Sequence, residues 1–167
     1  MKRTILSAAF AASVISLALA ACSSTPDAQT PAPQPTAPSS AFIEKLDADG
    51  LFAFGKAGIR DLSPDGRAAL DAIAARLSGS AHQLDIVHVI GHSDRIGNAK
   101  GNLRLSNQRA EAVRAYLIEH GVPAERITAV GRGDVEPVVE CRSERGQALI
   151  DCLAPNRRVE VRARFTD

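Results

Sequence analysis

The strongest constraint on the fold is a run of alternating residues near the C-terminus. Positions 158, 160, 162 and 164 are charged, and between them lie Val159, Val161, Ala163 and Phe165. Because successive side chains of a β-strand point to opposite faces, the run predicts a strand with one packed face and one charged face. The rest of the chain must therefore supply a layer that covers the packed face.

Five further segments carry the patterns of helices and strands. Apolar side chains recur at helical spacing over residues 64–77 and residues 99–119. Ser63 and Pro64 mark the start of the first of these helices, as N-cap and first helical residue. The segments with the character of short strands are residues 51–54, 84–90 and 127–130. The order β-α-β-α-β-β predicts one α/β domain over residues 41–167, a two-layer sandwich with a mixed sheet and helices on one face.

Residues 1–21 have the pattern of a secretory signal peptide. A basic start at Lys2 and Arg3 precedes an apolar run over residues 5–21 that ends in small residues. A membrane-spanning helix is the alternative interpretation, but the run is short for a span and no stop-transfer charges follow it.

The chain has three cysteines, and this odd number means that one of them has a use other than pairing. The sequence Leu19-Ala20-Ala21-Cys22 resembles a bacterial lipobox, which implies cleavage before Cys22 and acyl chains on that residue. Several acyl chains anchor a protein stably, whereas one holds it only marginally. Ser23, where an aspartate would signal retention in the inner membrane, favours the outer membrane. The alternative is a chance cysteine after an ordinary cleavage site.

Residues 22–40 are predicted to form the lipidated cysteine and a tether. Residues 23–40 hold five of the nine prolines and no large apolar side chain, which is typical of a semi-extended segment. At about 3.1 Å per residue, the tether reaches at most roughly 55 Å. The balance of 20 basic and 19 acidic side chains excludes a strongly basic nucleic-acid binder. The apolar content of 45% excludes wholesale disorder.

One arginine and one asparagine lie on a helix face that should be buried. Arg109 comes four residues after Leu105 and four before Val113, so it falls on the inward stripe of the second helix, and Asn102 continues that stripe. An inward guanidinium needs an anion, because an unpaired buried charge is very unfavourable. The anion is either a ligand or a structural carboxylate, and the spacing leaves both alternatives open.

A second arginine and an aspartate are expected near Arg109. Arg157 shares the parity of Val159 and should begin the inward face of the last strand, while Arg158 points outward. Asp94 follows the central strand at its carboxyl end, where open α/β sheets bind ligands. One carboxylate and two guanidinium groups suit a zwitterion, because the acid binds its ammonium and the arginines bind its carboxylate.

Three ordered motifs carry a family resemblance. They are Gly91-His92-Ser93-Asp94-Arg95-Ile96-Gly97, the spaced set Asn102, Leu105, Ser106, Arg109, Ala110 and Val113, and Asn156-Arg157-Arg158-Val159-Glu160. Together they resemble the OmpA-like peptidoglycan-binding domain over residues 50–165. The resemblance implies non-covalent binding of meso-diaminopimelate in the peptidoglycan stem peptide, with no enzymatic activity, metal or other cofactor.

The resemblance also assigns roles to individual residues. In the family, the positions that match Asp94 and Arg109 clamp the amino and carboxylate groups of diaminopimelate, and those that match Asn102 and Arg157 assist. The Ile96 backbone and Leu105 belong to the same site.

Two residues depart from the family pattern. Gly55 stands where many members have aspartate or asparagine, so no side chain is available for a contact from that position. Ile96 stands where several members have a hydroxyl residue, so only its backbone is available for a hydrogen bond.

The remaining cysteines and two histidines have structural interpretations. Cys141 and Cys152 of an exported protein should oxidise to a disulfide, and their segment resembles the disulfide-bearing insertion of enterobacterial members of the family. A metal site is the alternative, but the segment holds only two cysteines and no histidine. His88 and His92 lack the glutamate of a zincin motif, and they are predicted to pack in the sheet and to support the loop beside the site.

The leading hypothesis is therefore an outer-membrane lipoprotein of a Gram-negative bacterium, whose periplasmic domain ties the membrane to the cell wall. Its expected partners are peptidoglycan, outer-membrane lipid and other envelope proteins. One alternative is a peptidoglycan hydrolase with Asp94 as base, for which the sequence offers no second positioned acid or metal. The other alternative is an interaction subunit of a larger envelope complex.

Overall fold

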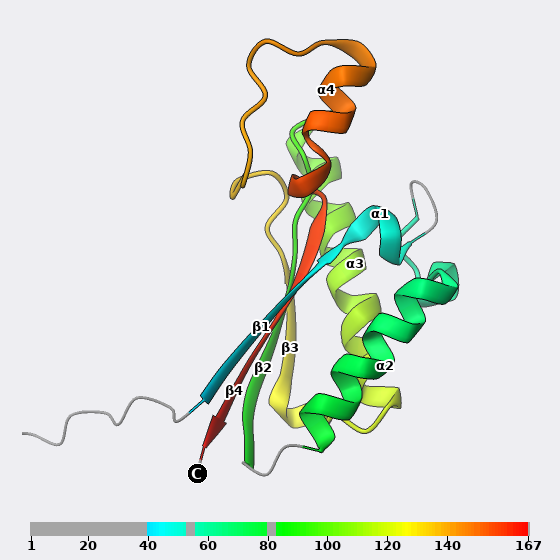
Figure 1. Cartoon of the computed structure of the whole chain (residues 1–167), viewed down its shortest axis with the longest axis vertical. Helices are drawn as coiled ribbons and strands as arrows, with labels where there is room; N and C mark the ends of the chain where they lie inside the picture. The colour runs from blue at the N-terminus through cyan, green and yellow to red at the C-terminus, as the bar shows by residue number, and fades with distance from the viewer. Residues whose placement is uncertain (1–39, 53–55, 80–82, 167) are drawn as a thin grey trace, which may run out of the picture. The chain divides into compact units, whose positions relative to one another are not determined.

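A four-stranded mixed sheet forms one layer of the domain (Figure 1). The computed structural model describes residues 40–52, 56–79 and 83–166. The strands are β1 (Ser40–Asp47), β2 (Gln83–Gly91), β3 (Ile127–Gly131) and β4 (Arg158–Thr166), in the order β1-β4-β2-β3. Strand β4 runs antiparallel to β1 and β2, and β2 runs parallel to β3.

Two long helices, α2 (Pro64–Ser78) and α3 (Ala99–Glu119), cover one face of this sheet, as Figure 1 shows. The shorter helices are α1 (Ala48–Leu51) and α4 (Gly146–Cys152), with single 3-10 turns at Ile59–Asp61, Ala124–Arg126 and Ala154–Asn156. The predicted two-layer α/β sandwich is confirmed. Within the described ranges, no helix combines the length and the apolar character needed to cross a membrane.

The long helices begin where capping side chains satisfy free backbone N–H groups. Ser63 Oγ accepts a hydrogen bond from the Gly66 N–H at 2.8 Å, which confirms the predicted start of α2. Asn98 Oδ1 does the same for the Gly101 N–H of α3 at 2.8 Å. Helix α3 ends at Glu119, and the chain turns away at Gly121, whose positive φ of 97° is a backbone conformation that glycine adopts at little cost.

The alternating face of β4 packs as predicted. Val159, Val161, Ala163 and Phe165 are all buried in the core that the helices cover. On the opposite face, Arg162 and Arg164 are exposed. The two charged residues nearest the start of the strand behave differently: Arg158 is 7% exposed and Glu160 is 2% exposed.

Two glycines let α3 lie directly against the sheet. A Cβ atom added to Gly91 of β2 would lie 2.0 Å from the Ser106 carbonyl oxygen, and one added to Gly131 of β3 would lie 2.3 Å from the Asn107 nitrogen. Only a residue without a side chain fits at these positions. The close contact brings the first half of α3 to the carboxyl ends of β2 and β3.

The prediction of a first strand at residues 51–54 is wrong. Leu51 ends helix α1, and Phe52 makes only an isolated bridge with Leu62; residues 53 and 54 lie outside the described ranges. The first strand is β1, which begins at Ser40, the last residue of the predicted tether. Phe42 is buried, but its neighbour Ile43 is 59% exposed, so this edge strand lacks a clean alternation of apolar and polar residues.

Several predictions concern residues that the structure does not describe. They are the signal peptide over residues 1–21, the lipidated Cys22, residues 23–39 of the tether and the departure at Gly55.

Candidate functional site

The loop after β2 carries Asp94 and holds its carboxylate on both oxygens. Oδ1 accepts the Ile96 backbone N–H at 2.8 Å, and Oδ2 accepts Nη1 of Arg157 at 2.7 Å. From the start of α3, Asn102 Nδ2 donates to the Asp94 carbonyl at 3.0 Å. Asp94 is only 8% exposed, so the carboxylate has a fixed position at the rim of the domain.

Arg157, which precedes β4, bridges three elements. Its Nε donates to Asp49 Oδ2 of α1 at 2.7 Å, and its Nη1 contacts both Asp94 and the Ile150 carbonyl of α4, the latter at 3.1 Å. Burial alone would lower the pKa of Arg157, but the hydrogen bonds to Asp94 and Asp49 outweigh burial and raise that pKa. The guanidinium is therefore held charged and in one orientation.

Arg109 of α3 is buried without a salt bridge to any residue that the structure describes. Its side chain is 3% exposed, its Nε donates to the Lys56 carbonyl at 3.2 Å, and its Cζ lies 5.7 Å from the centre of the Phe52 ring. Within the described part of the chain, its Nη1 has no hydrogen-bond partner. A buried donor of this kind is unfavourable unless a further group accepts from it.

The charge of Arg109 is coupled to those of the other site residues. Desolvation lowers the pKa of Arg109; Asp49, Asp47 and Asp94 act against that shift, while Arg157 adds to it. The charged cluster thus consists of two guanidinium and three carboxylate side chains. They come from the end of β1, helix α1, the loop after β2, the middle of α3 and the residue before β4.

Asp94 is linked to the other residues that the sequence pattern predicted for the site: it bonds Asn102 and Arg157, and its charge is coupled to that of Arg109. The alternative, a structural Arg–Asp bridge by Arg109, has no partner among the described residues, and the arginine that pairs with Asp94 is Arg157. The sequence did not reveal Asp49, which is 108 residues from its partner Arg157 and lies in no motif. The Lys56 carbonyl was also missed, because a backbone acceptor leaves no mark on the residue type.

Ile96 and Leu105 are the two other predicted contributors to the site. The Ile96 N–H already donates to Asp94, so its backbone acts on the site by fixing that carboxylate. Leu105, predicted to lie in the buried stripe of α3, is only half-buried. It lines a hollow of about 520 Å³ together with Lys56, Ile59 and Ala112.

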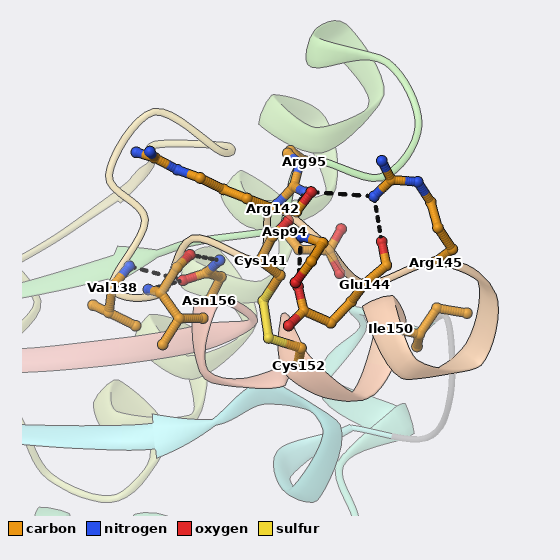
Figure 2. The surroundings of a disulfide bond; sticks show 12 residues. Asp94, Arg95, Val138, Cys141, Arg142, Glu144, Arg145, Ile150, Cys152 and Asn156 are labelled. Carbon is orange, nitrogen blue, oxygen red and sulfur yellow. Dashed lines mark hydrogen bonds between the residues drawn. A yellow bond between two sulfur atoms is a disulfide. The ribbon is translucent and has the colours of Figure 1, made fainter.

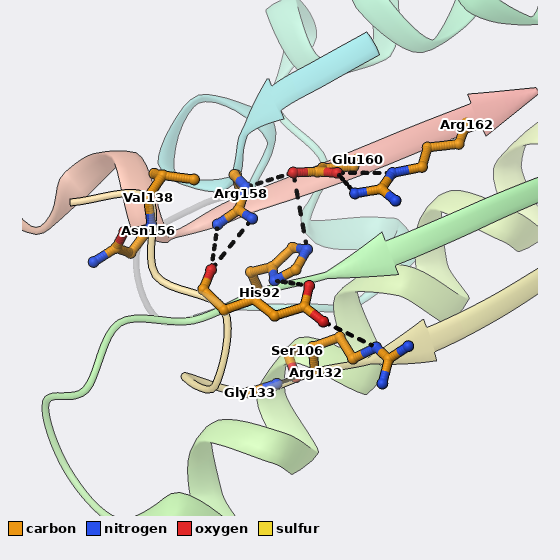
Figure 3. Close-up of polar contacts among 10 residues, drawn as sticks. His92, Ser106, Arg132, Gly133, Val138, Asn156, Arg158, Glu160 and Arg162 are labelled. Carbon is orange, nitrogen blue, oxygen red and sulfur yellow. Dashed lines mark hydrogen bonds and ion pairs between the residues drawn. The ribbon is translucent and has the colours of Figure 1, made fainter. Parts of the chain in front are cut away.

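A buried ionic network lies beside the site, on the face of the sheet opposite the helices (Figure 3). Glu160 accepts from Arg158 Nε at 2.7 Å and from Arg162 Nε at 3.0 Å. Burial would raise the pKa of Glu160, but the hydrogen bonds from both arginines prevail and lower it to about 2. Arg158 also donates to the Glu136 carbonyl, so the loop that carries Glu136 covers this face. Arg158 does point outward as predicted, but this loop buries it.

The two predicted histidine roles differ in outcome. His92 is fully buried beside the network, and desolvation, followed by the charge of Arg158, lowers its pKa. This position agrees with a supporting role for the loop. His88 is exposed and contacts Thr128 Oγ1 through Nδ1 at 2.8 Å, so it bonds across the sheet surface and does not pack in the core.

A disulfide closes the segment that precedes β4 (Figure 2). The sulfur atoms of Cys141 and Cys152 are 2.10 Å apart, which confirms the predicted pairing. Glu144 has a carboxylate oxygen near both sulfurs, but bonded sulfurs offer no thiolate for a metal. Asn156 anchors the start of the segment, since its side chain accepts from the Val138 and Val139 N–H groups and donates to the Val139 carbonyl.

A mixed sheet with helices on one face, and arginine and aspartate clustered at one end, defines the OmpA-like class of domain. The OmpA family matches residues 51–150, and the chain belongs to this family. Outer membrane protein A of Yersinia pseudotuberculosis is 45% identical over 137 residues, which are 80% of this chain and 37% of that protein. The chain therefore spans well under half the length of this relative.

Solved structures show the same fold. The cell wall anchor of the T6SS from Pseudomonas aeruginosa is 32% identical, with a TM-score of 0.59 over 76% of this chain and 82% of that one. The peptidoglycan-associated lipoprotein from Burkholderia pseudomallei is 25% identical, with a TM-score of 0.52 over 72% of this chain and 87% of that one.

Proposed function

We propose that the domain binds peptidoglycan non-covalently through the meso-diaminopimelate of the stem peptide. The observation that carries the proposal is the buried Arg109, whose Nη1 has no acceptor among the described residues and whose charge is coupled to the fixed carboxylate of Asp94. A free zwitterionic end of a side chain is complementary to this pair. The names of two structural relatives, a cell wall anchor and a peptidoglycan-associated lipoprotein, support the same function.

The charges assign one role to each residue. Arg109 donates to the ligand carboxylate in a charge-assisted hydrogen bond, which is stronger in a buried setting. Asp94 accepts from the ligand ammonium, and Asn102 keeps the Asp94 backbone in place. Because Oδ2 of Asp94 already accepts from Arg157, the ammonium either shares that oxygen or displaces the guanidinium toward Asp49.

Calorimetry with a stem peptide that contains meso-diaminopimelate, compared with the lysine analogue, tests the proposal. The lysine peptide lacks the terminal carboxylate and should bind at least about tenfold more weakly, the change expected from one lost charged contact. Asp94→Asn should abolish binding of the diaminopimelate peptide. Asp85→Asn is the matched control, since Asp85 lies at the opposite end of β2 and pairs with Arg164.

Equal binding of the two peptides, or undiminished binding by Asp94→Asn, would refute this site assignment. Release of soluble fragments from purified cell wall, lost in the same variant, would instead favour the hydrolase alternative.

We further propose that acyl chains on Cys22 hold the domain at the outer membrane, with residues 23–39 as the tether that precedes β1. The lipobox-like sequence before Cys22 supports this proposal, and several acyl chains suffice for stable anchoring. Cys22→Ser should shift the protein from the membrane fraction to the soluble periplasmic fraction. Retention of this variant in the outer membrane would count against lipid anchoring.

A further inference from the structure

We propose that the disulfide-closed segment, residues 141–152, positions Arg157 in the ligand site, so that reduction of the disulfide weakens ligand binding while the domain stays folded. This inference rests on the proposed function, because it concerns the affinity of the same site. It adds a redox-sensitive element to that site.

The first observation is the shared hydrogen bonding of Arg157. Its Nη1 donates to Asp94 Oδ2 at 2.7 Å and to the Ile150 carbonyl of α4 at 3.1 Å. Ile150 lies two residues before Cys152. The backbone of the closed segment therefore restrains the Arg157 guanidinium, which also bonds Asp94.

The second observation is a contact at the other end of the segment. Arg95, which follows Asp94 directly, donates from Nη2 to the Cys141 carbonyl at 2.5 Å. Figure 2 shows Arg95 and Asp94 close to Cys141, with Ile150 and Cys152 on the adjoining helix. Both ends of the closed segment thus contact the site, one through Arg157 and the other through the loop that carries Asp94.

The third observation is that the segment has little else to hold it in place. No residue between Cys141 and Cys152 is buried, and α4 has only seven residues with no side-chain cap at its N-terminus. A helix this short is not stable in water without tertiary restraint. The core consists of other residues, and Asn156 anchors the chain before Cys141 independently of the sulfurs.

Reduction by a dithiol removes the covalent restraint between Cys141 and Cys152. A dithiol such as dithiothreitol gives two electrons and two protons to the Cys141–Cys152 bond, which becomes two thiols, and the reagent becomes a cyclic disulfide. The freed segment frays, and the Ile150 carbonyl no longer holds Arg157. The guanidinium keeps its bonds to Asp49 and Asp94 but loses its third restraint, so it samples a wider range of orientations and binding must select one of them.

The test compares affinity for the diaminopimelate stem peptide in the oxidised and reduced protein. We expect reduction to weaken binding about tenfold, which corresponds to about 1.4 kcal/mol. The double variant Cys141→Ser/Cys152→Ser should match the reduced protein and should not respond to dithiothreitol. Arg142→Ala is the matched control within the segment, because Arg142 is 85% exposed and pairs with Glu140, not with a site residue.

Two further readouts separate positioning from a general structural role. The Nε–Hε resonance of Arg157 should broaden or shift on reduction, while the far-UV circular dichroism of the domain stays unchanged. In the Arg157→Ala variant, reduction should change affinity by less than about twofold, because the restrained group is absent.

Each outcome decides the matter. If the oxidised wild type does not bind the peptide, the proposed function itself is wrong. If it binds and the reduced protein binds equally well, only the positioning role is refuted. Unfolding on reduction, or an undiminished response in Arg157→Ala, would also refute it, because the segment would then act on the whole domain and not on Arg157.

Discussion

The replacement of Arg109 by methionine should separate ligand binding from stability. Methionine fills a similar volume and adapts to irregular spaces. The change removes a buried donor without a partner in the described structure, which relieves about 1–3 kcal/mol. It also removes the bond to the Lys56 carbonyl and the contact with Phe52, which together are worth about 2–4 kcal/mol. These terms nearly cancel, so the free energy of unfolding should fall by only about 1 kcal/mol.

The same substitution should abolish binding, because it removes the group that donates to the ligand carboxylate. A loss of about 100-fold or more is expected for a charged, buried contact. The chain contains no tryptophan, so urea unfolding is best followed by circular dichroism, and calorimetry measures binding. Arg104→Met is the matched control, since Arg104 is exposed on the same helix.

A destabilisation of more than about 3 kcal/mol would refute this reasoning, because that is the cost of breaking a buried ion pair. Arg109 would then be half of a structural pair. Retained binding with an unchanged stability would refute the ligand role instead.

The other predictions concern the supports of the site. The pKa of Glu160 is lowered from 4.5 to about 2 in the folded protein, so its contribution to the free energy of unfolding is complete above pH 4.5 and is lost as the pH falls through 2. Urea unfolding across this pH range should show that Glu160→Gln removes about 3 kcal/mol of the pH dependence of stability. An unchanged dependence of stability on pH in the variant would contradict this prediction. Gly91→Ala should lower the free energy of unfolding by at least about 2 kcal/mol, because its Cβ would lie 2.0 Å from the Ser106 carbonyl, whereas Gly50→Ala has ordinary contacts and should be tolerated. Equal thermal stability of the two glycine variants would show that α3 can move away from β2.

Local sequence patterns were sufficient to predict elements and buried residues that depend only on neighbouring positions in the chain. The alternation in β4 and the capping residue Ser63 predicted elements that the structure contains, because strand parity and helix capping act over a few residues. Arg109 could be identified for the same reason: its place on an apolar helix stripe already implied burial, and it is 3% exposed.

The pattern failed where burial depends on a distant segment. Arg158 and Glu160 carry the charges of a solvated strand face, yet the loop that contains Glu136 covers them. Strand β1 was missed because it is an edge strand with an exposed Ile43 next to a buried Phe42. Neither property can be derived from the spacing of residues within the element itself.

The sequence by itself therefore determined the class of fold and the identity of the charged residues turned inward, since periodicity and residue type are local properties. Only the tertiary structure decided which charges meet. Arg157 pairs with Asp94 and with Asp49, 63 and 108 residues away, while Arg109 keeps a donor without an acceptor among the described residues. The physical reason is that pairing energies depend on distance in space and on burial, and both are set by how the sheet, the helices and the disulfide-closed segment pack together.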